Sequence, residues 1–93
     1  MIVGTVLIDL NLPGVTSLKE KRRRLKPLLT RLQNRFNISI AEVDFNDNLK
    51  LAQIGAAVVS NNKAFADQVI AKLIDHIRGE PEIDLADYRV EIL

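Results

Sequence analysis

Apolar and polar positions along the chain follow two different periods, and the switches between them divide the sequence into six segments. Residues 2–10 are rich in β-branched side chains and have apolar positions on both faces of an extended chain. Residues 38–45 alternate as a strand, and residues 50–60 are apolar on both faces apart from Gln53. Residues 87–92 alternate strictly, with one apolar and one charged face. The pattern predicts four strands, of which the first and third are apolar on both faces and are therefore expected at the centre of the sheet.

Residues 18–36 have the period of an amphipathic helix. Ser17 and Glu20 match the capping box, in which Ser17 is the N-cap and Glu20 reaches back to the Ser17 amide. Six apolar side chains then fall within about 100° of arc: Leu18, Leu25, Leu28, Leu29, Leu32 and Phe36. Pro27 removes one helical hydrogen bond and costs about 3 kcal/mol. Because the stripe keeps its phase across Pro27, we expect a kink, the alternative being a second helix that begins near Lys26.

A second helix is predicted between the third and fourth strands. Its apolar residues recur at helical spacing from Phe65 to Ile77, after an N-cap supplied by Asn61-Asn62. Gly79 is a suitable residue to end it. Within the third strand, Gly55 indicates a bulge or a closely approaching neighbour.

The order strand, helix, strand, strand, helix, strand predicts a single ferredoxin-like domain over residues 1–93. This fold is a βαββαβ two-layer α+β sandwich, an antiparallel sheet with two helices on one face. Right-handed crossovers place the first and third strands at the centre of the sheet, in agreement with their apolar faces. The face without helices is then partly apolar, so we expect a homodimer, formed face to face or by edge strands.

Charge is distributed very unevenly. The chain has a net charge of only +1, yet residues 17–36 hold eight basic side chains and one acidic side chain, Glu20. The rest of the chain is acidic in balance. A net charge of +7 on one helix favours a phosphate-rich partner, so we predict RNA or ribosome binding without sequence reading. The candidate nucleic-acid-binding residues are Lys19, Lys21, Arg22, Arg23, Arg24, Lys26, Arg31 and Arg35.

Two other interpretations of this helix stay open. Lys and Arg are good helix formers on exposed surfaces, so the charges also fit a solvated face. An acidic surface on another protein is the third possibility, and it leads to the alternative function of a dimeric protein-interaction scaffold with no nucleic-acid role.

No catalytic constellation is recognisable, and we expect neither an enzyme nor a cofactor. The chain has no cysteine, which excludes disulfides, thiolate catalysis and Cys-type zinc sites. His76 is the only histidine, and the serines and threonines have no other identifiable base. Residues 44–48 begin like a calcium loop, but Leu49 and Gly55 occupy the positions that need Gly and Glu. Residues 11–16 lack the arginine of an acylphosphatase loop.

The apolar start of the chain is short and contains Asp9, so it is typical of a strand and not of a signal peptide. No stretch approaches the roughly 18 apolar residues that span a bilayer. We therefore expect a cytoplasmic protein with no membrane partner.

Three separated segments resemble the YlxP-like family of small bacterial proteins of unknown function. They are residues 17–22 (Ser-Leu-Lys-Glu-Lys-Arg), 35–43 and 87–93. The resemblance implies a ferredoxin-like fold and a gene that tends to lie among translation and ribosome-maturation genes. It implies no activity and no catalytic residues. The sequence departs from the family at residues 48–50, where many members have tryptophan, and at Pro27.

Overall fold

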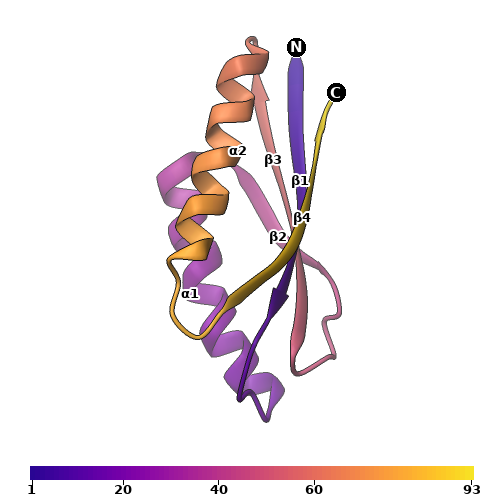
Figure 1. Ribbon diagram of the computed structural model, residues 1–93, viewed down its shortest axis with the longest axis vertical. Coiled ribbons are helices and arrows are strands. Elements are labelled where there is room, and N and C mark those ends of the chain that lie inside the picture. Colours follow the sequence, from indigo (N-terminus) through magenta and orange to yellow (C-terminus); the bar gives the residue numbers. More distant parts are fainter.

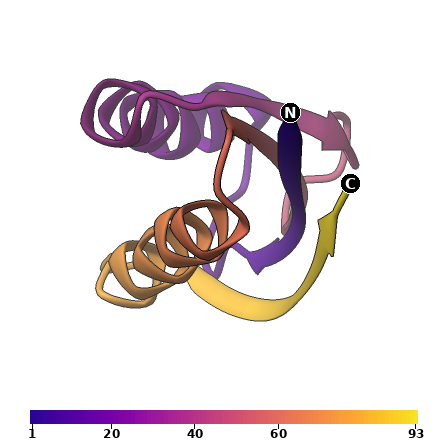
Figure 2. The same cartoon turned by 90° about the horizontal axis from the view of Figure 1, so that it is seen from above.

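Six elements follow one another in the computed structural model, which describes residues 1–93. They are β1 (Ile2–Asn11), α1 (Leu18–Phe36), β2 (Ser39–Asp44), β3 (Leu51–Ser60), α2 (Lys63–Arg78) and β4 (Asp84–Ile92). The four strands form one antiparallel sheet in the order β2-β3-β1-β4. Both helices cover the same face of this sheet and leave the other face open (Figures 1 and 2). The predicted ferredoxin-like sandwich and its two central strands are therefore confirmed.

The core lies between the sheet and the helices. Val6, Ile8 and Leu10 of β1 alternate toward the helices, and each is at most 1% exposed. The apolar stripe of α1 meets this surface through Leu25, Leu28 and Leu32, as its helical spacing predicts. From α2, the buried side chains are Ala66, Ile70, Leu73, Ile74 and Ile77. Helix α1 packs beside β2, and α2 packs over β1, β3 and β4.

Helix α1 begins as the capping pattern predicts, with one difference in detail. Ser17 is the N-cap, and its Oγ accepts a hydrogen bond from the Glu20 N–H at 3.1 Å. The Glu20 carboxylate accepts from the N–H of Thr16 at 3.3 Å, so the predicted contact with the Ser17 amide is wrong by one residue. The turn before α1 is an ordinary capped turn, in which Gly14 supplies a φ of 78°.

Pro27 lies inside α1 without ending it, since the helix runs continuously from Leu18 to Phe36. The alternative of two separate helices is therefore wrong. At Gly55 the close neighbour is Val43, because a Cβ at Gly55 would lie 3.0 Å from Val43 Cγ1. The irregularity in pairing lies in β2, between Glu42 and Asp44, and not at Gly55 itself.

Candidate nucleic-acid interface

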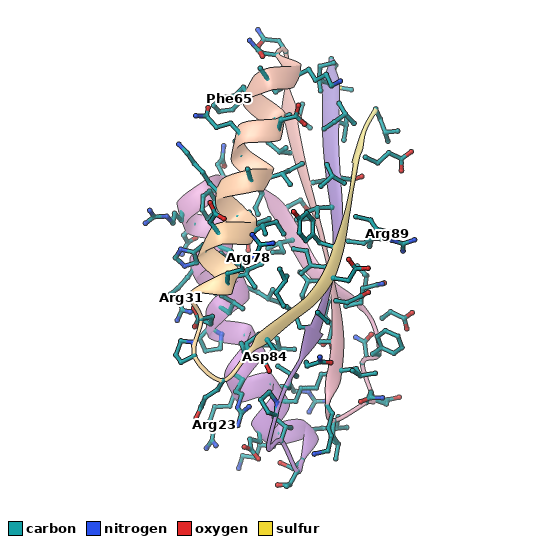
Figure 3. All side chains as sticks on the ribbon, viewed as in Figure 1. Arg23, Arg31, Phe65, Arg78, Asp84 and Arg89 are labelled. Atoms are coloured by element: carbon teal, nitrogen blue, oxygen red, sulfur yellow. The ribbon has the colours of Figure 1, made fainter.

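Four of the predicted basic residues form one exposed row on α1. Lys19, Arg22, Arg23 and Lys26 are spaced by three or four residues and therefore share one side of the helix. All four are exposed, and none has an acidic side chain within ion-pair distance. We call these four residues the basic stripe. With Pro27, Thr30 and Arg31 they line a shallow depression of about 720 Å³. Arg23 points out from the helix layer, away from the sheet (Figure 3).

The basic stripe is unfavourable for the helix that carries it. Lys19 lies in the first turn of α1, where the helix dipole favours acidic side chains. The residues of the basic stripe also form four like-charge pairs at spacings of three or four, which together cost about 1 kcal/mol. The positive field is therefore strong at this end of α1, and folding does not explain it.

Arg24 has a different role, because it ties three parts of the chain together. Its Nη1 donates to the carbonyl oxygen of Pro13 at 2.7 Å and to that of Glu82 at 3.1 Å. Its Nη2 lies 3.3 Å from Glu20 Oε1. The guanidinium group thus fastens the turn before α1 and the connection before β4 to the helix.

Arg31 and Arg35 lie in the second half of α1. The Arg31 guanidinium group pairs with the carboxylate of Glu80, which follows α2. Arg35 has no acidic partner, and its guanidinium carbon lies 5.7 Å from the centre of the Phe36 ring. Both side chains are exposed. Arg31 lines the same depression as the basic stripe, whereas Arg35 lies apart from the stripe, beside Phe36, Lys72 and His76.

Lys21 is the exception among the predicted residues, because it is only 1% exposed. Its Nζ donates to the carbonyl oxygen of Phe45 at 2.6 Å and lies 2.9 Å from Glu42 Oε2. The contact with Glu42 is an ion pair without hydrogen-bond geometry at Oε2. The expectation that Lys21 contacts phosphate is corrected here, since its ammonium group has no free surface. Glu42, the partner of Lys21, is not among the residues predicted from the sequence.

The other polar candidates are engaged in local structure. The His76 and Phe36 rings pack in a T-shaped arrangement with 6.0 Å between the ring centres. In the connection between β2 and β3, Asp44 accepts from the Phe45 N–H and Asn48 accepts from the N–H groups of Lys50 and Leu51. No group of three or more His, Cys, Asp or Glu residues is placed to hold a metal ion. Neither helix is long and apolar enough to cross a membrane.

Comparison with known proteins identifies the family. The family model described as "Protein of unknown function (DUF503)" matches residues 3–90. The chain belongs to the DUF503 family. The "Uncharacterized protein YlxP" of Bacillus subtilis (strain 168) is 39% identical over 75 residues, which cover 81% of this chain and 82% of that protein. The resemblance to YlxP-like proteins is therefore confirmed, and the DUF503 family has no described activity.

Solved structures support the fold of this DUF503 chain and nothing further. At3g17210 from Arabidopsis thaliana is similar with a TM-score of 0.57 and 14% identity, over 98% of this chain and 92% of that one. The de novo designed protein LFR1 1, described as having a ferredoxin fold, gives a TM-score of 0.51 and 11% identity. That match covers 100% of this chain and 84% of the designed one.

Proposed function

We propose that this DUF503 protein is a non-enzymatic, cytoplasmic protein that binds RNA or the ribosome by holding phosphates on the basic stripe. The observation that supports this function is the row of four exposed cations without acidic partners in the first half of α1. Such a row costs helix stability, so binding is the better reason for its presence. The translation setting implied by the family resemblance agrees with this partner.

The proposed contacts are to the phosphate backbone and not to bases. Lys19, Arg22, Arg23 and Lys26 hold phosphates. Arg35 adds an unpaired positive charge farther along the helix, and Arg31 contributes less because it pairs with Glu80. Strands β1 and β3 have no aromatic residue, so the sheet offers no surface on which bases stack. Phosphate contacts alone give binding with little sequence preference.

The first prediction concerns the dependence of RNA binding on salt. Each phosphate that a cation neutralises contributes about 0.7–0.9 log units of affinity per log unit of salt. The double variant Arg22→Glu/Arg23→Glu should bind at least about tenfold more weakly, and its salt slope should be smaller by roughly 1.4–1.8. The measurement is equilibrium binding of labelled structured RNA and of ribosomal subunits across a salt series.

A matched control is available on α2. Lys63→Glu/Lys72→Glu makes the same change in net charge at two exposed lysines that also have no acidic partner. This variant should keep most of the affinity, because the proposed contacts depend on the position of the charges. Equal loss in both variants would indicate an effect of net charge alone and would contradict the basic stripe as the site.

A second prediction separates two adjacent arginines. Arg24→Gln should lower the free energy of unfolding by about 1–2 kcal/mol, because it leaves the carbonyl groups of Pro13 and Glu82 without their donor. Arg23→Gln should not destabilise the fold, and it should weaken RNA binding. Urea unfolding and RNA binding of both variants test this. A larger loss of stability in Arg23→Gln than in Arg24→Gln would contradict the assignment.

A homodimer is the second part of the proposal. The open face of the sheet exposes Leu7, Val43 and Val59, and the outer edges of β2 and β4 are unpaired. The alternative function is a dimeric protein-interaction scaffold whose basic helix meets an acidic protein. Co-purified partners that survive nuclease treatment would favour this alternative over RNA binding.

A further inference from the structure

The outer edge of β4 presents a regular row of backbone groups that no neighbouring strand pairs. Val3 and Leu93 exchange both backbone hydrogen bonds, at 3.1 and 2.8 Å. Because bonded residues alternate in an antiparallel pair, Arg89 and Glu91 also direct their N–H and C=O groups toward β1. Tyr88, Val90 and Ile92 therefore direct theirs away from the sheet. The row is regular over residues 87–93, because the one shift in the pairing of β4 with β1 lies between Leu85 and Asp87.

The core is incomplete beside this edge. Tyr88 and Val90 lie on the helix-facing side of β4, yet they are 38% and 44% exposed. Their neighbours at the same level on β1, Val6 and Ile8, are at most 1% exposed. Tyr88 and Val90 line a groove of about 410 Å³ against Ile70 and Ile74 of α2, and Asp67, Asp75 and Arg78 form its polar rim. The Arg78 guanidinium carbon lies 5.7 Å from the centre of the Tyr88 ring. A further strand beside β4 would cover the exposed parts of both side chains.

The charges on the other side of β4 match a second copy of the same strand. Asp87, Arg89 and Glu91 alternate in sign on the open face, and Arg89 points away from the helices (Figure 3). When two copies pair antiparallel with Val90 opposite Val90, each Arg89 faces Glu91 of the second copy. On the helix side, the same register places Tyr88 opposite Ile92, an aromatic and β-branched pair that stabilises sheets.

Other two-fold registers fit less well. With Arg89 opposite itself, the two arginines repel, and Asp87 faces Glu91. With Tyr88 opposite itself, Arg89 faces Asp87, but Val90 then meets Ala86, where the register of β4 shifts. The Val90-centred register uses residues 87–93 symmetrically and places no two like-charged side chains opposite each other. Its one local cost is at the Tyr88 N–H, which must leave the Asp87 carboxylate, 2.8 Å away.

We infer that two copies of this chain associate through β4 into one continuous eight-stranded antiparallel sheet. This inference rests on the proposed homodimer and is independent of RNA binding. A two-fold axis normal to the sheet keeps all four helices on the same face, with the α2 helices beside the junction. Since α1 packs beside β2, the two basic stripes lie at the outer flanks, about 30 Å apart for strands spaced at about 4.8 Å. The pair then offers two separate phosphate-binding rows to one partner.

The test is sedimentation velocity of the purified chain without RNA, over a range of protein concentrations. The wild type should dimerise, and Arg89→Glu should raise the dimer dissociation constant by about tenfold or more, because it places Glu opposite Glu twice. The swap Arg89→Glu/Glu91→Arg should restore dimerisation. Val90→Pro should abolish it, since this N–H has no partner within the chain and edge strands tolerate proline. Circular dichroism verifies that each variant is folded.

The outcomes distinguish a failure of the β4 interface from a failure of the proposed homodimer on which it rests. A wild type that is monomeric at every concentration overturns both the homodimer and the β4 interface. A dimer that is unaffected by Arg89→Glu and Val90→Pro overturns the β4 interface alone, because the copies then meet elsewhere. If the swap Asp87→Arg/Arg89→Asp dimerises and the swap Arg89→Glu/Glu91→Arg does not, Arg89 faces Asp87 of the second copy. That result overturns the Val90-centred register. RNA binding by Arg22→Glu/Arg23→Glu has no bearing on any of these results.

Discussion

Replacing Lys21 by methionine is expected to lower the free energy of unfolding by about 3 kcal/mol, the largest single effect that we predict. Methionine keeps much of the apolar stem of the lysine but removes the ammonium group. The Glu42 carboxylate then loses its only cation, and the Phe45 carbonyl loses a donor at 2.6 Å. Because the Glu42 side chain is 21% exposed, water compensates part of the loss, and we expect the lower end of the range for broken buried pairs.

A double variant tests whether the loss of stability comes from the charge left without a partner on Glu42. Lys21→Met/Glu42→Leu removes both charges, and replacing a buried ion pair by apolar residues is often close to neutral. It should therefore recover most of the stability lost in Lys21→Met. Lys19→Met is the control, since Lys19 lies on the same helix, is exposed and should change the stability by less than about 0.5 kcal/mol.

Urea unfolding followed by circular dichroism measures these differences. Thermal unfolding should show a fall in Tm of more than about 10 °C for Lys21→Met. Equal stability of Lys21→Met and Lys19→Met would show that the buried pair contributes little. A double variant as unstable as Lys21→Met would instead assign the loss to the missing bond with Phe45.

The basic residues of α1 include exposed cations and cations that pair within the protein, and the sequence alone predicts only part of this difference. The spacing of apolar residues predicts the six elements. It also predicts the central position of β1 and β3, because both strands carry apolar side chains on both faces, although only the face toward the helices is buried. The count of charges predicts that α1 is basic. It does not predict which cations are exposed, since that depends on the elements that pack against the helix.

The sequence does contain a signal for the burial of Lys21. Lys21 follows Leu18 by three residues and precedes Leu25 by four, so it lies in the apolar stripe of the helix. Glu42 is two residues from Ile40 on β2, so both side chains are on the same face of the strand, the one toward the helices. Two opposite charges in apolar rows indicate a buried pair, but only the packing of α1 beside β2 brings them together. Arg24 has no comparable signal, because its partners are backbone carbonyl groups in distant connections.

The basic stripe is consequently a better-defined hypothesis than the total charge of +7 on residues 17–36. Three of the eight basic side chains pair with carboxylates contributed by residues 20, 42, 80 and 82, so they add little to the field outside the protein. The charge available to a partner is concentrated at the start of α1. This concentration makes the effect of position testable, since variants with equal net charge should differ in binding.

The second large effect is expected at Gly4, the glycine of β1, where a side chain of α2 lies close to the backbone of the strand. A Cβ at Gly4 would lie 3.0 Å from Ile70 Cδ1, 3.2 Å from Val58 Cγ1 and 3.3 Å from Ile92 Cδ1. Gly4→Val should therefore lower the free energy of unfolding by about 2–3 kcal/mol, because overpacking displaces α2. The better strand propensity of valine offsets only part of this cost. Urea unfolding measures it.

Two further variants show whether steric crowding is the cause. Ala57→Val adds a β-branched side chain to the open face of β3, where no helix lies, and should change the stability by less than about 0.5 kcal/mol. Ile70→Ala alone should destabilise the protein by leaving a cavity, whereas in the Gly4→Val background it makes room for the new side chain. The double variant should thus be more stable than the sum of the two single losses by about 1 kcal/mol or more. Strict additivity would mean that Gly4 does not set the distance between α2 and the sheet.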